Sequence, residues 1–178
     1  MKAFLATRKT DFPETETLTL MDGFNGKTIS GIDEPDLTLN LSRGGCPNLV
    51  EISRCKLAAI QDERGKTLHW DDKKTFVSQT IYRDCIFSEG SKLEAKAVYN
   101  CTITQPEKDE NWIHRHGGVP AIEVVSSEGV FNTKLSSKSL GIRVKSPVVE
   151  GCTIESGRRY VELIGIKKLA SSSLGARS

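Results

Sequence analysis

A short pattern recurs along most of this chain and constrains its fold more than any other feature. In each copy a turn-forming residue precedes a small or apolar residue, a variable residue and a large apolar residue. Seven copies span residues 17 to 154. They begin at Thr17, Asp36, Arg54, Asp84, Asn100, Asn132 and Gly151. Such a period is typical of proteins that stack one structural unit on the next.

The spacing of the copies indicates a constant unit with two insertions. Four of the six steps between copies measure 16 to 19 residues, and the other two measure 30 and 32. The additional residues fall at about 61–74 and 105–120. These segments contain glycine or proline and lack an apolar stripe at helical spacing. We therefore expect inserted loops and no helix in any repeat.

The polarity within each copy predicts β-strands. In Cys101-Thr102-Ile103 a polar residue separates two apolar ones, which is typical of a strand with one buried face. The steps leave no room for a helix in each unit, and no Asn-Gly hairpin turns recur. An all-β coil of parallel strands fits this spacing best.

The first residue of the last four copies predicts a tight corner. Asp84, Asn100, Asn132 and Gly151 belong to the residue types that adopt a left-handed backbone at the lowest cost. If these corners coincide, their side chains form a turn ladder with a spacing of about 4.8 Å. Arg54 and Thr17 depart from the rule, so the corner is less regular in the N-terminal half.

The segments YRDCIFSEG, VYNCTITQ, GVFNTKLSS and VEGCTIES resemble the right-handed parallel β-helix of the pectate-lyase-like superfamily, and most of all phage tailspikes and related virion proteins. With the repeat, this resemblance implies an all-β solenoid of about seven rungs over residues 17–166. Residues 1–16 would form an N-terminal arm or cap, and 167–178 a polar C-terminal tail. The resemblance does not specify an activity, because this fold supports many functions.

The charge distribution argues against a nucleic-acid partner. The 25 Lys and Arg residues are interleaved with 23 Asp and Glu, which gives a net charge of +2 and no basic stripe. No apolar run has the length of a signal peptide or a membrane span. We expect no cofactor, no membrane contact and synthesis in a cytoplasm without export.

The five cysteines divide into two groups. Cys55, Cys85, Cys101 and Cys152 share one position of the repeat, so we expect buried, reduced thiols that fill space. Cys46 lies outside the pattern in a turn-like RGGCP segment, where it is either a free thiol or half of an intermolecular disulfide. No zinc-site spacing is present.

Both tryptophans and all three histidines fall in the insertions. We expect both insertions to follow the same strand of the repeat, so that together they form one surface that binds a partner or a glycan. Its candidate residues are His69, Trp70, Asp71, Asp72, Trp112, His114, Arg115 and His116. Alternatively each Trp covers its own rung. A metal held by His114 and His116 with Asp71 or Asp72 is a weaker alternative.

A row of charged residues is expected on an outer strand face. Its members are Glu94, Lys96, Glu123, Arg143 and Lys145. These types suit β-elimination of an acidic sugar chain, but pairing of Glu123 with Arg143 between rungs explains them equally well. No carboxylate pair recurs at rung spacing, so we assign no catalytic residue.

Together these features favour a non-enzymatic structural protein of a phage virion, a capsid-decorating or linking subunit. Its partners would be the major capsid protein or neighbouring decoration subunits, with a homo-oligomer as a further possibility. Phe4, Leu5 and Phe12 at one end, and 160–166 at the other, are candidates for end covers or docking. The alternatives are a glycan-binding or glycan-cleaving tailspike-like module, and a cytoplasmic β-helix scaffold that polymerises as bactofilin-like proteins do.

Overall fold

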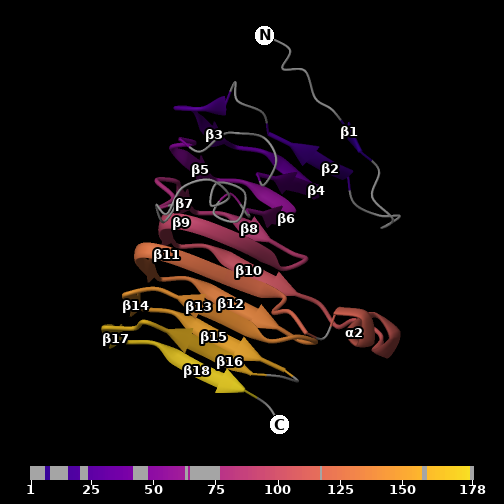
Figure 1. Cartoon of the computed structure of the whole chain (residues 1–178), viewed down its shortest axis with the longest axis vertical. Coiled ribbons are helices and arrows are strands. Elements are labelled where there is room, and N and C mark those ends of the chain that lie inside the picture. Colours follow the sequence, from indigo (N-terminus) through magenta and orange to yellow (C-terminus); the bar gives the residue numbers. More distant parts are fainter. Residues whose placement is uncertain are drawn as a thin grey trace, which may run out of the picture.

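The chain folds into stacked β-strands with a short helix at one side, as the computed structural model in Figure 1 shows. The structure describes residues 7–8, 16–20, 24–41, 48–62, 64, 77–116, 118–157 and 160–176. The strands belong to one sheet in which neighbouring strands run parallel, apart from β1 (Thr7–Arg8), which pairs antiparallel with β2 (Glu16–Thr19). The all-β prediction with parallel strands is therefore confirmed. No helix in the described ranges has the length and apolar character needed to cross a membrane.

The strands form three series of parallel neighbours. The first series contains β3 (Thr28–Ser30), β5 (Glu51–Ser53), β7 (Ile81–Arg83), the C-terminal parts of β9 (Ser91–Tyr99) and β11 (Ile122–Phe131), β14 (Val148–Glu150) and β17 (Lys168–Ala170). The second contains β2, the C-terminal parts of β4 (Asp33–Asn40) and β6 (Lys56–Gln61), the N-terminal parts of β9 and β11, β13 (Ile142–Lys145) and β16 (Val161–Ile164). The third contains the N-terminal parts of β4 and β6, β8 (Ile86–Phe87), β10 (Thr102–Gln105), β12 (Lys134–Ser137), β15 (Thr153–Ser156) and β18 (Ser173–Ala176).

The chain passes from the first series to the third through a left-handed corner. This corner residue has a positive φ in every repeat, at Gly31, Arg54, Asp84, Asn100, Asn132, Gly151 and Ser171. The side chain of Asn100 donates a hydrogen bond of 3.0 Å to Asp84 Oδ1, one repeat earlier. A Cβ on Gly151 would overlap Asn132 Oδ1, so any side chain at this corner would require the Asn132 amide to move.

The corner also corrects the alignment of the first two copies of the sequence pattern. The copies that begin at Thr17 and Asp36 lie in β2 and β4 of the second series, not in the third series with the other five. Alternation of Leu and Thr looks the same in any half-buried strand, and so it does not identify the series. The corner of that repeat lies instead at Gly31, with a φ of 74°.

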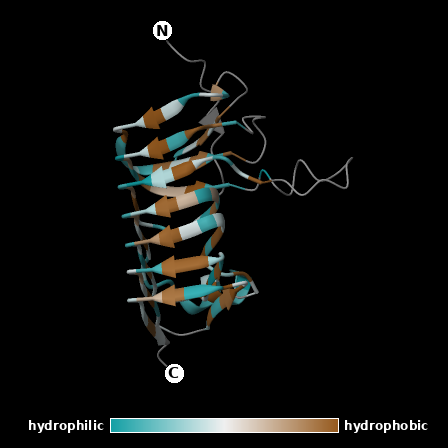
Figure 2. Ribbon diagram, turned by 90° about the vertical axis from the view of Figure 1, so that its left-hand side faces the viewer, coloured by the Kyte–Doolittle hydropathy of each residue, from teal (hydrophilic) through white to brown (hydrophobic). Residues whose placement is uncertain are grey.

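Side chains of one type of position stack between repeats and form the core. In the third series these are Leu57, Phe87, Ile103, Leu135 and Ile154, each at most 1% exposed. Figure 2 shows hydrophobic segments in the stacked strands. Cys55, Cys85, Cys101 and Cys152 follow the corners and are buried free thiols, as predicted. Each fully buried Leu, Ile or Phe stabilises the fold by about 1.5–3 kcal/mol.

Two expectations about the outer parts of the repeats are wrong. Residues 167–178 were expected to be a polar tail, but β17 and β18 pair in register with β14 and β15. The signal is present in the sequence, because Ser171-Ser172-Ser173-Leu174 is a further copy of the recurring pattern. In the second insertion, where no helix was expected, the helix α2 (Glu110–His116) forms.

Local contacts explain this helix. The side chain of Asp109 accepts a hydrogen bond of 2.8 Å from the backbone N–H of Trp112, which caps the first turn. The last turn contains three residues with basic side chains, His114, Arg115 and His116. Basic side chains are favourable there because the C-terminal end of a helix carries the negative end of its dipole. Both signals lie at the ends of the helix and do not require an apolar stripe along it. A search for helical periodicity therefore does not find this helix.

Candidate functional site

The helix α2 and its two connecting segments project from the side of the strand stack (Figure 1). None of the seven residues of α2 is buried. Trp112, Ile113 and His116 are partly buried, and the other four residues of the helix are exposed. Because a short helix in water is stabilised mainly by packing one face, this incomplete burial leaves surface for another contact. We take residues 106–119, apart from residue 117, as the candidate site and refer to them as the α2 projection.

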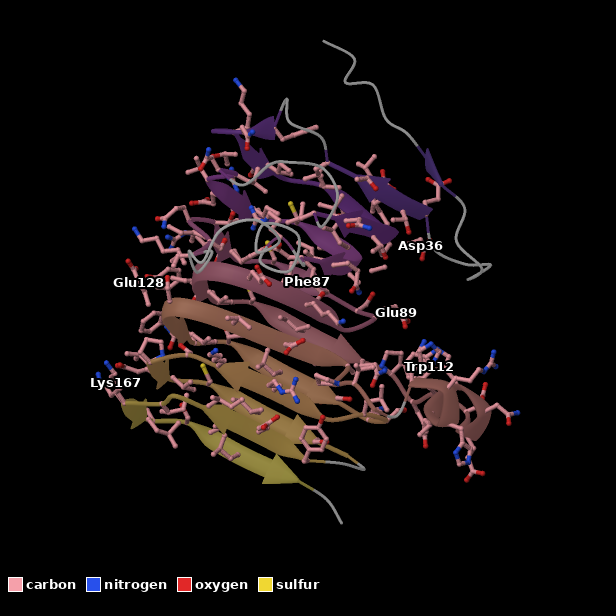
Figure 3. All side chains as sticks on the ribbon, viewed as in Figure 1. Asp36, Phe87, Glu89, Trp112, Glu128 and Lys167 are labelled. Atoms are coloured by element: carbon pink, nitrogen blue, oxygen red, sulfur yellow. The ribbon has the colours of Figure 1, made fainter. Side chains whose placement is uncertain are left out.

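The base of the α2 projection is fastened to the strands by polar contacts. The backbone N–H of Lys108 donates a hydrogen bond of 2.7 Å to Ser139 Oγ, and Lys108 Nζ lies 2.5 Å from a carboxylate oxygen of Glu89. The same ammonium lies 5.8 Å from the centre of the Trp112 ring, a cation–π contact. The projection is thus held at its base, and no residue of its helix is fully buried (Figure 3).

The aromatic residues of α2 are arranged by the helix itself. Trp112 and His116 stack with ring centres 4.3 Å apart, and His116 Nδ1 lies 2.9 Å from the carbonyl oxygen of Trp112. His114 and Arg115 are exposed, and Val119 beyond the helix is also largely exposed. An aromatic pair beside an exposed Arg is typical of a protein-contact surface.

The helix argues against the metal site considered from the sequence. His114 and His116 are two residues apart, and such residues do not face each other on a helix. In the described part of the chain no group of three or more His, Cys, Asp or Glu residues is arranged to hold a metal ion. The other proposed ligands, Asp71 and Asp72, lie outside the described residues.

The two insertions do not leave the same edge of the strand stack, so the expectation of one shared loop surface is wrong in its premise. The first insertion begins after β6 in the second series and ends at β7 in the first. The second begins after β10 in the third series and ends at β11 in the second. His69, Trp70, Asp71, Asp72 and Cys46 lie outside the described residues.

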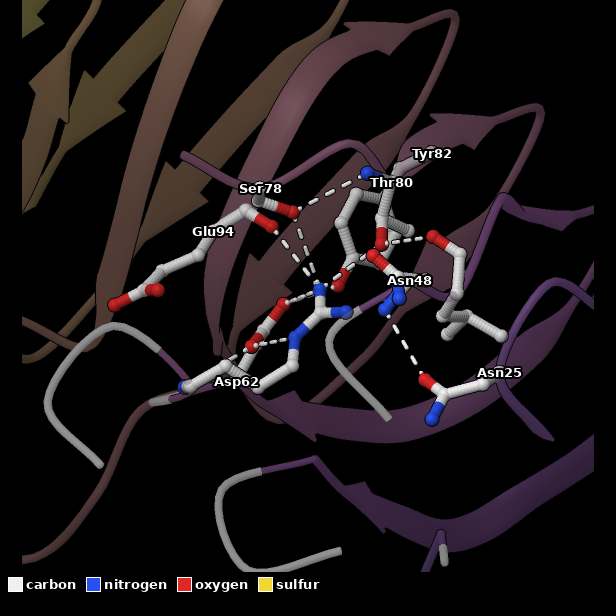
Figure 4. A network of polar contacts seen from close by, with 9 residues as sticks. Asn25, Asn48, Asp62, Ser78, Thr80, Tyr82 and Glu94 are labelled. Atoms are coloured by element: carbon white, nitrogen blue, oxygen red, sulfur yellow. Dashed lines mark hydrogen bonds and ion pairs between the residues drawn. The ribbon is translucent and has the colours of Figure 1, made fainter. Parts of the chain in front are cut away.

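A buried polar network, which the sequence analysis missed, joins the two ends of the first insertion. The guanidinium of Arg64 forms a 2.6 Å ion pair with Asp62 and donates hydrogen bonds to Ser78 and Thr80. Tyr82 donates a further hydrogen bond of 2.8 Å to Asp62. Figure 4 shows Asp62, Ser78, Thr80 and Tyr82 gathered in this network.

The network is fully enclosed. The side chains of Arg64 and Asp62 are 2% and 0% exposed, and Tyr82 is completely buried. Burial, and after it the negative charge of Asp62, raises the pKa of the Tyr82 hydroxyl well above its usual value. A buried charge pair of this kind is costly to break, because the remaining charge has no water to solvate it. The network joins the two ends of the first insertion inside the core, and its polar groups bond to one another.

Four members of the charged row, Glu94, Glu123, Arg143 and Lys145, lie over the second series and line a groove of about 380 Å³. The guanidinium of Arg143 contacts Glu162 at 2.6 Å and Glu123 at 3.2 Å, so the expected pairing of Glu123 with Arg143 is confirmed. The hydrogen bonds that Arg143 donates to Glu162 and to Glu123 raise its pKa further, the one to Glu162 more strongly. Lys96 contacts Glu128 at 3.5 Å. Ion pairing between repeats therefore accounts for Lys96, Glu123 and Arg143.

Three of the four buried thiols have a raised pKa, whereas a hydrogen bond with Cys85 lowers the pKa of Cys101. The pKa of Cys55 is raised by a hydrogen bond with Cys85 and by burial, and that of Cys152 is raised by burial. A hydrogen bond with Cys101, together with burial, raises the pKa of Cys85 to about 12. All four side chains are at most 1% exposed, so they fill space in the core and no reagent reaches them from solvent.

Comparison with known proteins gives no relatives. No family model, no curated protein and no solved structure matches this chain.

Proposed function

We propose that this chain is a right-handed parallel β-helix of about seven rungs that acts as a rigid, non-enzymatic structural module and binds another protein through the α2 projection. The proposal for the fold is supported by parallel partners that lie one repeat apart in three series. A stack of this kind is stiff, because every strand pairs with its neighbours along its length. Such stiffness suits a protein that spaces or clamps other subunits.

The observation that carries the functional proposal is a helix with no fully buried residue, fastened at its base and with Glu110, Asn111, His114 and Arg115 exposed. Holding the base reduces the entropy that is lost when the helix meets a partner. His114 and Arg115 would contribute polar contacts at the rim, and Trp112 and Ile113 apolar area.

We further propose that the partner is a shell protein of a phage particle, so that the chain is a capsid-decorating or linking subunit. This part rests on the similarity of four segments to the rungs of tailspike and virion β-helices. The relation to the pectate-lyase-like superfamily has the same basis.

The experiment is a particle-association assay. Particles from cells that make the chain are purified on a density gradient, and the chain is quantified in each fraction by mass spectrometry. We expect the chain to sediment with the particles at a fixed ratio to the main shell protein. Arg115→Glu should release most of it, whereas Lys134→Glu, the same charge change on an exposed strand residue, should not. A chain that stays at the top of the gradient would overturn the proposal.

The paired charges of the groove favour a binding or structural function over a polysaccharide lyase, because Arg143 is engaged by two carboxylates. Incubation of the purified chain with bacterial polysaccharides should therefore produce no new reducing or unsaturated ends. The appearance of such ends, and their loss in Arg143→Gln, would favour the alternative of a glycan-cleaving module.

A further inference from the structure

The outer face of the first series is more apolar than that of the third, where Thr102, Lys134 and Thr153 occupy outward positions. Figure 1 places β7, β9, β11, β14 and β17 along one side of the stack, the side that faces the viewer in Figure 2. Four of these strands each contribute a fully buried inward residue: Tyr82, Val98, Val130 and Val149. Side chains alternate along a strand, so the residues on either side of these four point outward. Five of the outward residues are apolar or aromatic: Ile81, Ala97, Tyr99, Phe131 and Val148.

The middle of this face is a column of stacked side chains. The rings of Tyr99 and Phe131 have centres 5.0 Å apart and planes 12° apart, and the guanidinium of Arg83 lies 4.7 Å from the centre of the Tyr99 ring. A Cβ on Gly129 would overlap the Phe131 ring, so this ring lies directly against the strand. The column is therefore held in one arrangement, which lowers the entropy lost when another surface meets it.

A pair of opposite charges lies on each side of the apolar centre. Toward the N-terminal end of the stack, the carboxylate of Glu51 in β5 lies 4.0 Å from the guanidinium of Arg83 in β7. Toward the C-terminal end, the carboxylate of Glu150 in β14 lies 2.6 Å from the ammonium of Lys168 in β17. The order along the stack is therefore acid, base, apolar centre, acid, base. Reversed, this order is base, acid, apolar centre, base, acid, so the face is complementary to its own copy turned end for end.

The register of the strands gives this match residue by residue. A twofold axis parallel to the strands, between β9 and β11, places β7 against β14 and β5 against β17 of a second copy. Arg83 then faces Glu150 of the other copy. Glu51 faces Lys168 of the other copy in the same way. All four charges at the two ends of the face thus meet an opposite charge.

The same axis matches the centre and one border of the face. Ile81 faces Val148 of the other copy, so apolar side chains meet beside the aromatic column. At the border with the second series, Lys96 lies 3.5 Å from Glu128 within one molecule. These two residues belong to β9 and β11, which the axis exchanges, so Lys96 also faces Glu128 of the other copy.

The remaining charges of the described residues around this face do not oppose the arrangement. The charged corner residues Arg54 and Asp84 face two uncharged corners of the other copy, at Ser171 and Gly151. Lys167, just before β17, faces the position just before Glu51, so it also lies near a carboxylate. Lys27 lies one strand beyond this position, at the exposed edge, where solvent and salt screen its repulsion with Lys167.

From this pattern we propose that the outer face of the first series is a self-association surface, on which a second copy of this chain docks end for end through the same face. An interface that uses one surface on both subunits closes after two copies, so it gives a dimer and no filament. Its centre lies at β9 and β11 in the middle of the stack, so it does not depend on the strands at either end. It also does not depend on the α2 projection, which connects the other two series.

The size of the face sets the expected affinity. Six strands at ~4.8 Å give a face about 30 Å long. This is small for a permanent interface, so we expect a reversible dimer with a dissociation constant in the micromolar range.

The first test reverses one charge at each end of the face, and the mass of the full chain is measured by light scattering over a range of concentrations. The wild-type mass should rise from 19.6 kDa towards twice that value. Arg83→Glu and Glu150→Arg each place like charges against each other twice in their own dimer, so each should raise the dissociation constant by at least about tenfold. Lys134→Glu, the same kind of change on an exposed residue of the third series, is the control and should leave the dimer intact.

Mixing the two variants separates docking from any effect on folding. When Arg83→Glu meets Glu150→Arg, the two introduced charges face each other with opposite sign, and the other end of the face keeps its wild-type pair. The mixture should therefore dimerise about as well as the wild type, although neither variant does so alone. Contacts within each variant are the same before and after mixing, so they cannot explain the recovery. A mixture that stays monomeric, with both variants folded by circular dichroism, would overturn the proposal.

The second test uses the wild-type chain and a carbodiimide, which joins a lysine amine directly to a carboxylate. Within one chain Lys168 and Glu51 lie five strands apart, about 24 Å at ~4.8 Å per strand, which is too far for such a link. We expect mass spectrometry to find a Lys168–Glu51 link in the cross-linked dimer and not in the monomer. A chain that is monomeric at millimolar concentration, a filament, or a dimer linked only at other residues would each overturn the proposal.

Discussion

The two insertions are attached to the same stack in opposite ways. The first is closed at its base by a fully buried ion pair between Asp62 and Arg64, to which Ser78 and Thr80 from the other end of the insertion are hydrogen-bonded. The second is held by Lys108 and Glu89 at the surface, and no residue of its helix is fully buried. The first attachment is thus part of the folded core, whereas the second leaves a segment that can serve binding without a large effect on stability.

This difference predicts unequal costs of mutation, and the largest is at Arg64. Arg64→Ala leaves the carboxylate of Asp62 buried without its cation, and should lower the free energy of unfolding by about 3–5 kcal/mol. Urea unfolding followed by circular dichroism measures this. Lys56→Ala, which breaks the exposed pair with Asp33, is the control and should cost at most about 1 kcal/mol. Equal losses in the two variants would contradict the contrast.

A smaller loss is expected from Tyr82→Phe. This change removes the hydrogen bond to Asp62 and keeps the ring in the core, so it should cost about 1–2 kcal/mol in urea unfolding. A loss below about 0.3 kcal/mol would mean that the hydroxyl contributes nothing to the network.

The same residue predicts a dependence on pH. The pKa of Tyr82 is raised in the folded state, so the unfolded chain releases this proton at lower pH than the folded chain does. Stability from this group is therefore complete below the unfolded pKa of about 10 and is lost as the pH rises above it. The free energy of unfolding, measured from pH 8 to 11, should fall more steeply in the wild type than in Tyr82→Phe. The variant has no hydroxyl at this position and therefore no proton that the unfolded and folded states release at different pH. Parallel curves would contradict the assignment.

The second insertion should respond weakly. Lys108→Ala removes a partly exposed ion pair with Glu89 and should lower the free energy of unfolding by no more than about 1 kcal/mol. The expected effect is local, since hydrogen exchange of the amides in α2 should become faster while that of β9 stays unchanged. If β9 amides exchanged faster as well, the second attachment would also belong to the core.

The smallest effect on stability is expected from Trp112→Ala. Trp112 is only partly buried, and its ring contacts with Lys108 and His116 lie within the α2 projection, so this change should alter the free energy of unfolding by about 0.5 kcal/mol or less. Its effect should instead appear in the particle-association assay. A loss of several kcal/mol would show that Trp112 is a core residue and not part of a contact surface.

The sequence predicted the stack well because its signals are local and repeated. Corner residues such as Asn100 and Asn132, and the alternation that follows them, are dictated by backbone geometry that any single repeat reveals. The N-terminal repeats were harder, since Arg54 occupies a left-handed corner that its residue type does not favour. At Arg54 the contacts with the neighbouring strands impose the left-handed backbone conformation.

The contacts between distant residues could not be predicted in the same way. Asp62 and Arg64 are partnered by Ser78, Thr80 and Tyr82, and no spacing in the sequence indicates that these five residues meet. The positions of the insertions relative to the three series could not be predicted either, because they also depend on which distant segments of the chain lie side by side. The helix α2 was missed because its signals lie in the cap and last turn.

The central claim is that each strand lies parallel to the strand one repeat earlier, with equivalent residues side by side. A crystal structure of the full chain tests this most directly. It should place β10 parallel to both β8 and β12, with Ile103 between Phe87 and Leu135 in the core. Antiparallel neighbours at these strands, or Ile103 far from either residue, would contradict the account.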